Sequence, residues 1–194
     1  MSDLALRCEC GTVTGVAEHV TRRSSNRLVC YCSDCQAFAN RLGASARVLN
    51  EHGGTEIFQV APSRVKVLQG HDQIACLKLS EKGPFRWYAK CCNTPIGNTM
   101  KPEVPFIGLI SAFIDMEAAD QDPQIGPAQC HCQTQYALES WPSDQKRTGF
   151  PVGFTIRMMV FIMGWKMRGL GKENPFFTSA GDPIAASKQD APKQ

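Results

Sequence analysis

Three cysteines occupy the stretch CYCSDC at residues 30–35. Cys32 and Cys35 have the two-residue gap of a zinc knuckle, in which a tight turn aims both sulfurs at one ion. Cys30 lies two residues before Cys32, so its side chain points to the same side of an extended strand. Three thiolates can therefore converge on one Zn²⁺ ion. An open fourth position is typical of a catalytic site and a filled one of a structural site, and the spacing leaves both open.

Two further cysteine pairs lie far apart in the chain. Cys8 and Cys10 belong to the stretch CEC, whose two sulfurs share one face of a strand and make half of a tetrahedral site. The stretch KCCNTPIG, with Cys91 and Cys92, is the natural donor of the other half. The binding energy of such a long-range site is folding energy, because the unfolded chain has no preformed site.

Clustered cysteines also occur in disulfide frameworks and in redox pairs. The first residues show neither the basic segment nor the apolar core of a signal peptide, so we expect a reducing, cytoplasmic setting. In such a setting clustered cysteines are more often metal ligands or catalytic groups than disulfides. Redox pairs usually stand at a helix start in a βαβ context, which the sequence does not show. Metal binding is therefore the favoured interpretation and a redox role the least favoured.

The three remaining cysteines stand outside these groups. Cys76 alternates with Leu77 and Leu79 in an apolar stretch and is predicted to be a small buried side chain. The stretch CHC at 130–132 has metal-like residues at alternating spacing. It also reads as a plain strand with His131 on the face opposite the two sulfurs. An auxiliary or competing half-site and a plain strand are both open there.

The elements that position these cysteines are predicted to be mostly strands. Short, partly alternating stretches rich in β-branched or aromatic residues recur between turns, which favours an antiparallel all-β body. These stretches are TVTGV, EIFQV, RVKVLQ, IACLKLS and FRWYA. One short helix is expected from Ser33 to Asn40, with Ser33 or Asp34 as its N-cap. The predicted fold class is mainly β.

The composition of the 194 residues is that of a folded globular protein, with 43% hydrophobic and 20% charged residues. The formal net charge is +3, and the whole excess lies beyond residue 137. So small a surplus does not predict binding to nucleic acid, which usually needs a dense basic stripe.

The segment 150–177 differs from the rest of the chain because it is rich in Met and aromatic residues. Its apolar run from Val152 to Trp165 contains Arg157 and is too short to cross a membrane, which takes about 20 residues. We expect a helix packed on the sheet. The alternative is an interfacial helix that contacts a membrane or a protein partner. The predicted regions are a zinc-binding β domain at 1–140, an apolar and basic helical extension at 141–178, and a disordered tail at 179–194.

The motif order CECG, CYCSDC and RWYAKCCNTPIG resembles the glutathione-dependent formaldehyde-activating enzyme family, which includes the centromere-protein-V-like domains. The resemblance covers residues 5–137 and implies a tent-like arrangement of β-sheets with two zinc ions. The implied structural zinc takes Cys8, Cys10 and Cys92, and the implied catalytic-type zinc takes Cys30, Cys32 and Cys35.

The late knuckle departs from the family pattern. Ala89 stands where the first knuckle cysteine belongs, and Cys91 is its only local replacement. Adjacent residues on a strand point to opposite faces, so Cys91 can join Cys92 on one ion only where the backbone turns. Asn93 stands in place of a glycine, which is tolerable because Asn enters left-handed conformations more readily than most residues.

The resemblance implies a carbon–sulfur lyase that acts on glutathione or another thiol adduct, with the metal as Lewis acid and thiolate stabiliser. No general base is assigned, since Asp34 is equally suited to cap the helix. The alternative is a non-catalytic, zinc-stabilised binding module that uses the segment 150–177. An accessible zinc beside Cys32 favours the enzyme, and two closed four-sulfur sites favour the module.

Overall fold

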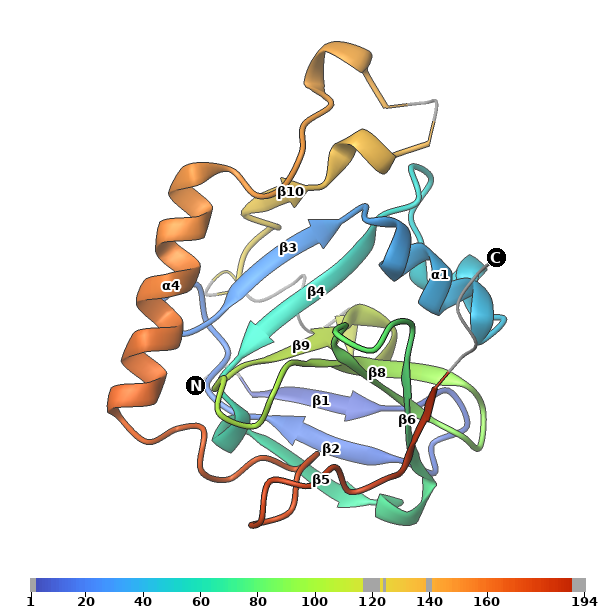
Figure 1. Ribbon diagram of the computed structural model, residues 1–194, viewed down its shortest axis with the longest axis vertical. Coiled ribbons are helices and arrows are strands. Elements are labelled where there is room, and N and C mark those ends of the chain that lie inside the picture. Colours follow the sequence, from blue (N-terminus) through green and yellow to red (C-terminus); the bar gives the residue numbers. More distant parts are fainter. Residues whose placement is uncertain (1–2, 117–122, 124, 139–140, 190–194) are drawn as a thin grey trace.

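The computed structural model describes residues 3–116, 123, 125–138 and 141–189. Its strands form two sheets (Figure 1). The small sheet is antiparallel and consists of β1 (Leu4–Arg7), β2 (Thr14–Ala17) and β5 (Val65–Gln69), in that order. The large sheet has the order β10 (Cys130–Cys132), β3 (Asn26–Cys30), β4 (Thr55–Val60), β9 (Ile107–Ile110), β8 (Thr94–Thr99), β7 (Phe85–Ala89), β6 (Ile74–Lys78) and β11 (Ser187–Gln189). The predicted mainly-β class is confirmed.

The inner strand pairs of the large sheet are antiparallel, whereas both outermost pairs are parallel. Parallel neighbours need a long connection, and each edge strand does come from far along the chain. The five predicted strand stretches overlap β2, β4, β5, β6 and β7. Strands β3 and β9 were not predicted, because every residue in them is buried and no alternation marks them.

The two sheets share one apolar core. In β1 the side chains of Leu4 and Leu6 are buried while Ala5 and Arg7 are exposed, as the two-residue period of a strand requires. Trp87 of β7 is fully buried in this core, and its Nε1–H donates to Oγ1 of Thr99 over 2.8 Å. The large apolar residues of the core include Phe58, Trp87, Ile96, Ile107, Leu109 and Phe113.

Helices α1 (Ser33–Arg41) and α2 (Ser45–Val48) contribute to a second apolar cluster, in which Phe38 packs with Leu77 and Ile110 of the large sheet. The short helix is confirmed, but its predicted N-cap is wrong. Cys32 holds that position, because its backbone is extended and its sulfur accepts a hydrogen bond from the Cys35 N–H over 3.4 Å.

Helix α4 (Val152–Met167) lies beside the end of the large sheet formed by β3 and β10 (Figure 1). Phe154 is buried there against Leu28 and Cys30 of β3. Arg157 reaches the same strand, and its Nε–H donates to Oδ1 of Asn26 over 2.8 Å. Among the described residues, no helix has the length and apolar character that crossing a membrane requires.

Beyond α4 the chain returns to the main core. Phe176 is fully buried and its ring stacks on Trp87 at 4.9 Å between centroids. The segment predicted to be a disordered tail is described as far as residue 189, where β11 pairs in parallel with β6. Residues 190–194 lie outside the described residues. The boundaries of the three predicted regions stay predictions.

Candidate metal centres

Four sulfurs from two distant segments meet just after β1 and in the turn between β7 and β8. This first cluster consists of Cys8, Cys10, Cys91 and Cys92, whose sulfurs all lie within 4.8 Å of one another. The Cys10–Cys91 sulfur distance is 3.3 Å, Cys8–Cys10 is 3.6 Å and Cys8–Cys91 is 3.9 Å. A tetrahedral zinc ion with bonds of about 2.3 Å separates its sulfurs by about 3.8 Å. The first cluster thus has the spacing of a tetrahedral metal site.

Cys91 and Cys92 are adjacent, so both can reach one ion only where the backbone turns. The turn that carries them meets this condition. The chain leaves β7 at Ala89, whose carbonyl accepts from the Cys92 N–H over 3.4 Å. Asn93 then adopts a left-handed conformation with φ of 55°, in agreement with its expected tolerance of that region. Because the backbone turns here, both sulfurs reach the cluster.

Backbone and hydroxyl groups surround these sulfurs with hydrogen bonds. The Val13 N–H donates to the sulfur of Cys8 over 3.2 Å. The hydroxyl of Thr94 lies 3.1 Å from the sulfur of Cys92 and also accepts from the Glu9 N–H over 3.1 Å. Donors aimed at a sulfur favour its ionised form, which is the form that binds metal.

The thiols of the first cluster differ in their acidity. Hydrogen bonds from Thr12 lower the pKa of Cys10 to about 6. Burial raises the pKa of Cys8, and burial together with the neighbouring thiols raises the pKa of Cys91 to about 12. Cys10 therefore ionises before Cys8 and Cys91.

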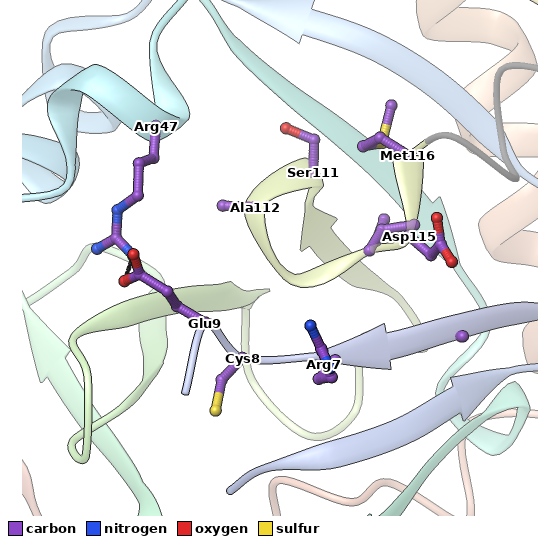
Figure 2. A pocket seen from close by; sticks show the side chains of 10 residues that line it. Arg7, Cys8, Glu9, Arg47, Ser111, Ala112, Asp115 and Met116 are labelled. Carbon is purple, nitrogen blue, oxygen red and sulfur yellow. Dashed lines mark ion pairs between the residues drawn. The ribbon is translucent and has the colours of Figure 1, made fainter. Parts of the chain in front are cut away.

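A cleft of about 740 Å³ lies on the other side of β1 (Figure 2). Its lining includes an ion pair between Arg47 and Glu9. Figure 2 shows the sulfur of Cys8 pointing away from Arg47 and Ser111. Side chains alternate along an extended strand, so Arg7 and Glu9 face the cleft while Cys8 faces inward. The cleft therefore does not expose the Cys8 sulfur.

The second cluster consists of Cys30, Cys32 and Cys35, whose sulfurs lie within 4.8 Å of one another. Cys30 ends β3, Cys32 caps α1 and Cys35 lies in its first turn. Cys30 and Cys35 are each 7% exposed, whereas Cys32 is half-buried. The strand-turn-helix sequence predicted for these three residues therefore brings them together.

Cys32 is the most acidic thiol of the second cluster. Hydrogen bonds from the thiols of Cys30 and Cys35 lower its pKa to about 2. The backbone N–H of Cys35 and the positive charge of Arg86 act in the same direction. Arg86 is 3% exposed and pairs with Asp34 at 3.3 Å, so Asp34 has a partner other than the helix end.

The stretch CHC at 130–132 is a strand, and His131 is exposed while both cysteines are buried. The predicted strand with His131 on the face opposite the two cysteines is confirmed, and the half-site alternative stays a prediction. Its parallel register, however, sets Cys132 opposite Cys30. The two cysteines belong to one buried apolar cluster, and the Cys132 thiol is the main cause that raises the pKa of Cys30. Sequence reasoning did not connect Cys132 with the second cluster, and its alternating spacing was the only available signal.

All ten cysteines are free thiols. Cys76 is 1% exposed, as predicted for a small buried side chain. Thiolate groups favour zinc and other soft metal ions over hard ions such as Mg²⁺ and Ca²⁺. The donor chemistry and spacing of both clusters are therefore compatible with a bound metal ion.

Residues 1–188 match the model of a family described as a family of unknown function (DUF6151). No curated protein matches the chain.

Proposed function

The chain belongs to DUF6151, a family of unknown function, and we propose that it is a zinc-stabilised binding module with one zinc ion in each cysteine cluster. One observation carries the proposal. The sulfurs of Cys10 and Cys91 lie 3.3 Å apart although 81 positions separate them in the sequence. Four free thiols brought so close across the fold are the ligand set of a structural zinc site.

Zinc is the metal that best suits these ligands, because it is redox-inert and accepts tetrahedral sulfur coordination. Thiolates also bind Cu(I) and the iron of iron–sulfur clusters, from which elemental analysis distinguishes zinc. The resemblance of the motifs to the formaldehyde-activating family supports zinc at the same cysteines. Bound in the first cluster, zinc would supply folding energy by tying the end of β1 to the turn after β7.

Metal content tests the zinc part of the proposal. Protein purified under reducing, metal-free buffers should contain two zinc ions per chain by elemental analysis and by native mass spectrometry. A folded, metal-free protein that keeps its circular dichroism spectrum after exhaustive chelation would overturn the proposal.

The binding part of the proposal rests on α4. Six apolar side chains form a stripe along its solvent face, since they recur at helical spacing and are 54–81% exposed. This apolar stripe consists of Val152, Ile156, Met159, Val160, Met163 and Met167. The helix contains no acidic residue, and Lys166, Arg168 and Lys172 are exposed around its C-terminal end. Apolar residues flanked by basic ones suit an anionic membrane surface, which we propose as the ligand.

Vesicle sedimentation tests this surface. The zinc-loaded protein should sediment with vesicles that contain phosphatidylserine and not with pure phosphatidylcholine vesicles. Val160→Glu should abolish sedimentation, because it places a charge inside the stripe. Leu68→Glu is the matched control, since Leu68 is 63% exposed on β5 and lies outside α4. Absence of binding, or a dimer that Val160→Glu dissociates, would overturn the membrane assignment.

A second candidate function is a carbon–sulfur lyase acting on a glutathione adduct, and the acidity of Cys32 and its partial exposure favour it. In the addition direction the thiol sulfur bonds to the carbonyl carbon of a one-carbon aldehyde and the thiol proton passes to the oxygen. The lyase direction reverses both changes. Zinc held by Cys30, Cys32 and Cys35 would supply Lewis acidity and stabilise a thiolate.

Calorimetry separates the two candidates. If the second cluster takes a thiol adduct, glutathione should release heat on binding to the wild-type protein and none on binding to Cys32→Ser. No binding heat in either protein would reject the lyase and leave the binding module.

A further inference from the structure

We propose that Cys132 of β10 is the fourth protein ligand of the second cluster and makes it a closed four-sulfur site. The inference rests on the proposed zinc binding and adds a residue that the local motif CYCSDC does not contain. It is carried by the pairing of β10 with β3, by the burial of Cys132, and by the chemistry of its neighbours.

The register of β10 points Cys132 toward the cluster. In the parallel pair with β3, Cys132 stands opposite Cys30 and Cys130 stands opposite Leu28. Paired residues of neighbouring strands project on the same side of a sheet. His131, which alternates with the two cysteines, is exposed on the other side and lies 3.0 Å from the hydroxyl of Tyr31. The sulfur of Cys132 is therefore on the same side as that of Cys30.

The surroundings of Cys132 are sulfur and hydrocarbon. Its side chain is fully buried in a cluster with Cys30, Cys35 and Phe154. Because the Cys132 thiol is already buried beside Cys30, it can bind the same metal ion without displacing water.

The backbone on both sides of Cys132 is fixed. Its carbonyl accepts from the Tyr31 N–H over 3.1 Å. Gln133 follows with a left-handed φ of 57°, and its N–H donates to the Gly149 carbonyl over 2.9 Å. The sulfur of Cys132 can thus change position only by rotation of its side chain, because the backbone that carries it stays paired with β3.

Such a rotation is what metal binding requires. The group of sulfurs within 4.8 Å of one another contains Cys30, Cys32 and Cys35 but not Cys132. A change between staggered χ1 positions moves the sulfur of a cysteine without moving its backbone. Four thiolates around Zn²⁺ carry a net charge of −2, and the buried guanidinium of Arg86 acts on Cys32 as the nearby positive charge. A closed site leaves no coordination position for a thiol adduct, which favours the binding module over the lyase.

Cobalt substitution tests the inference without any activity. Wild-type protein loaded with two Co²⁺ ions should show sulfur-to-cobalt charge transfer that is unchanged by glutathione or imidazole. Cys132→Ser should lose about one eighth of that absorbance, since one of eight cobalt–sulfur bonds is removed. The variant should also respond to imidazole, because the substitution opens one position. The affinity of its second cluster for zinc, measured by competition with a chelator, should be at least about tenfold lower than in the wild type.

Cys130→Ser is the matched control, because Cys130 is buried on the same strand and the same side, opposite Leu28 instead of Cys30. This variant should keep the wild-type cobalt spectrum. Equal losses in the two variants would assign the effect to the packing of β10 and overturn the inference, as would a wild-type spectrum that shifts with imidazole.

X-ray absorption of the wild-type zinc protein keeps the inference testable if Cys132→Ser does not fold. A mean of four sulfurs per zinc supports the closed site, whereas a mean of about three and a half contradicts it. A wild-type protein that binds no metal would instead contradict the proposed zinc binding itself, so the two failures are distinguishable.

Discussion

The sulfur of Cys10 lies 3.3 Å from the sulfur of Cys91. Cys10 follows a strand of the small sheet and Cys91 stands in a turn of the large sheet, so their contact joins the two sheets at one edge of the core. A metal ion at this point opposes separation of the sheets, and its binding energy adds to the stability of the folded state alone.

Loss of one first-cluster ligand should therefore weaken the whole fold. We expect Cys91→Ser to bind one zinc ion fewer per chain and to melt about 10 °C lower, which corresponds to about 3 kcal/mol for a chain of this size. Elemental analysis and calorimetry measure the two effects. Cys76→Ala is the control, because Cys76 is buried but belongs to neither group of candidate ligands, so its replacement should leave both zinc ions bound. Two zinc ions in Cys91→Ser would contradict the prediction.

Arg157 should determine how firmly α4 is held to the sheet. Its guanidinium donates to Oδ1 of Asn26 over 2.8 Å and to the Ser25 carbonyl over 3.3 Å. Asn26 is fully buried, so Arg157→Met leaves its oxygen without this donor and should destabilise the protein by about 1–3 kcal/mol. Amide hydrogen exchange should become faster in α4. Lys166→Met on the same helix is exposed and should change neither quantity, and equal exchange rates in both variants would refute the role of Arg157.

Two glycines should respond in opposite ways to alanine. A Cβ at Gly54 would lie 2.6 Å from ring carbon Cε1 of Tyr31 and 2.6 Å from Cγ1 of Val29. Gly54→Ala should therefore cost about 1–3 kcal/mol through overpacking. A Cβ at Gly164 of α4 meets no atom within 4 Å, so Gly164→Ala should stabilise the helix by about 0.5–1 kcal/mol. Urea unfolding of both variants measures the difference, and a shift in the same direction would be inconsistent with these contacts.

Cys76 should make stability fall at alkaline pH. Burial raises its pKa to about 12 from an ordinary value of 9.0, so the unfolded chain releases this proton at lower pH than the folded one. The stabilisation is complete below about pH 9 and is lost as the pH rises from about 9 toward 12. The melting temperature of Cys76→Val should thus decrease less between about pH 8 and about pH 10 than that of the wild type. An equal decrease would mean that the thiol does not titrate differently in the two states.

Much of the fold was predictable from short-range patterns. Stretches rich in β-branched or aromatic residues between polar turns marked β2, β4 and β7, and of these β2 alternates strictly in burial. The patterns failed for β3 and β9, because strands buried on both faces show no alternation. They also gave no sign that the segment after α4 returns to the core, where Phe176 stacks on Trp87.

The sequence by itself determined that sulfurs would gather at Cys30, Cys32 and Cys35, because the geometry of a strand end and a helix start is fixed within six residues. Only the tertiary structure decided that Cys91 joins the first cluster. Its sulfur meets that of Cys10, 81 positions earlier in the chain, because the backbone turns after β7. The same holds for Cys132, whose place opposite Cys30 follows from the pairing of an edge strand. Local spacing fixes directions over a few residues, whereas strand pairing over long separations depends on how the whole chain buries its apolar surface.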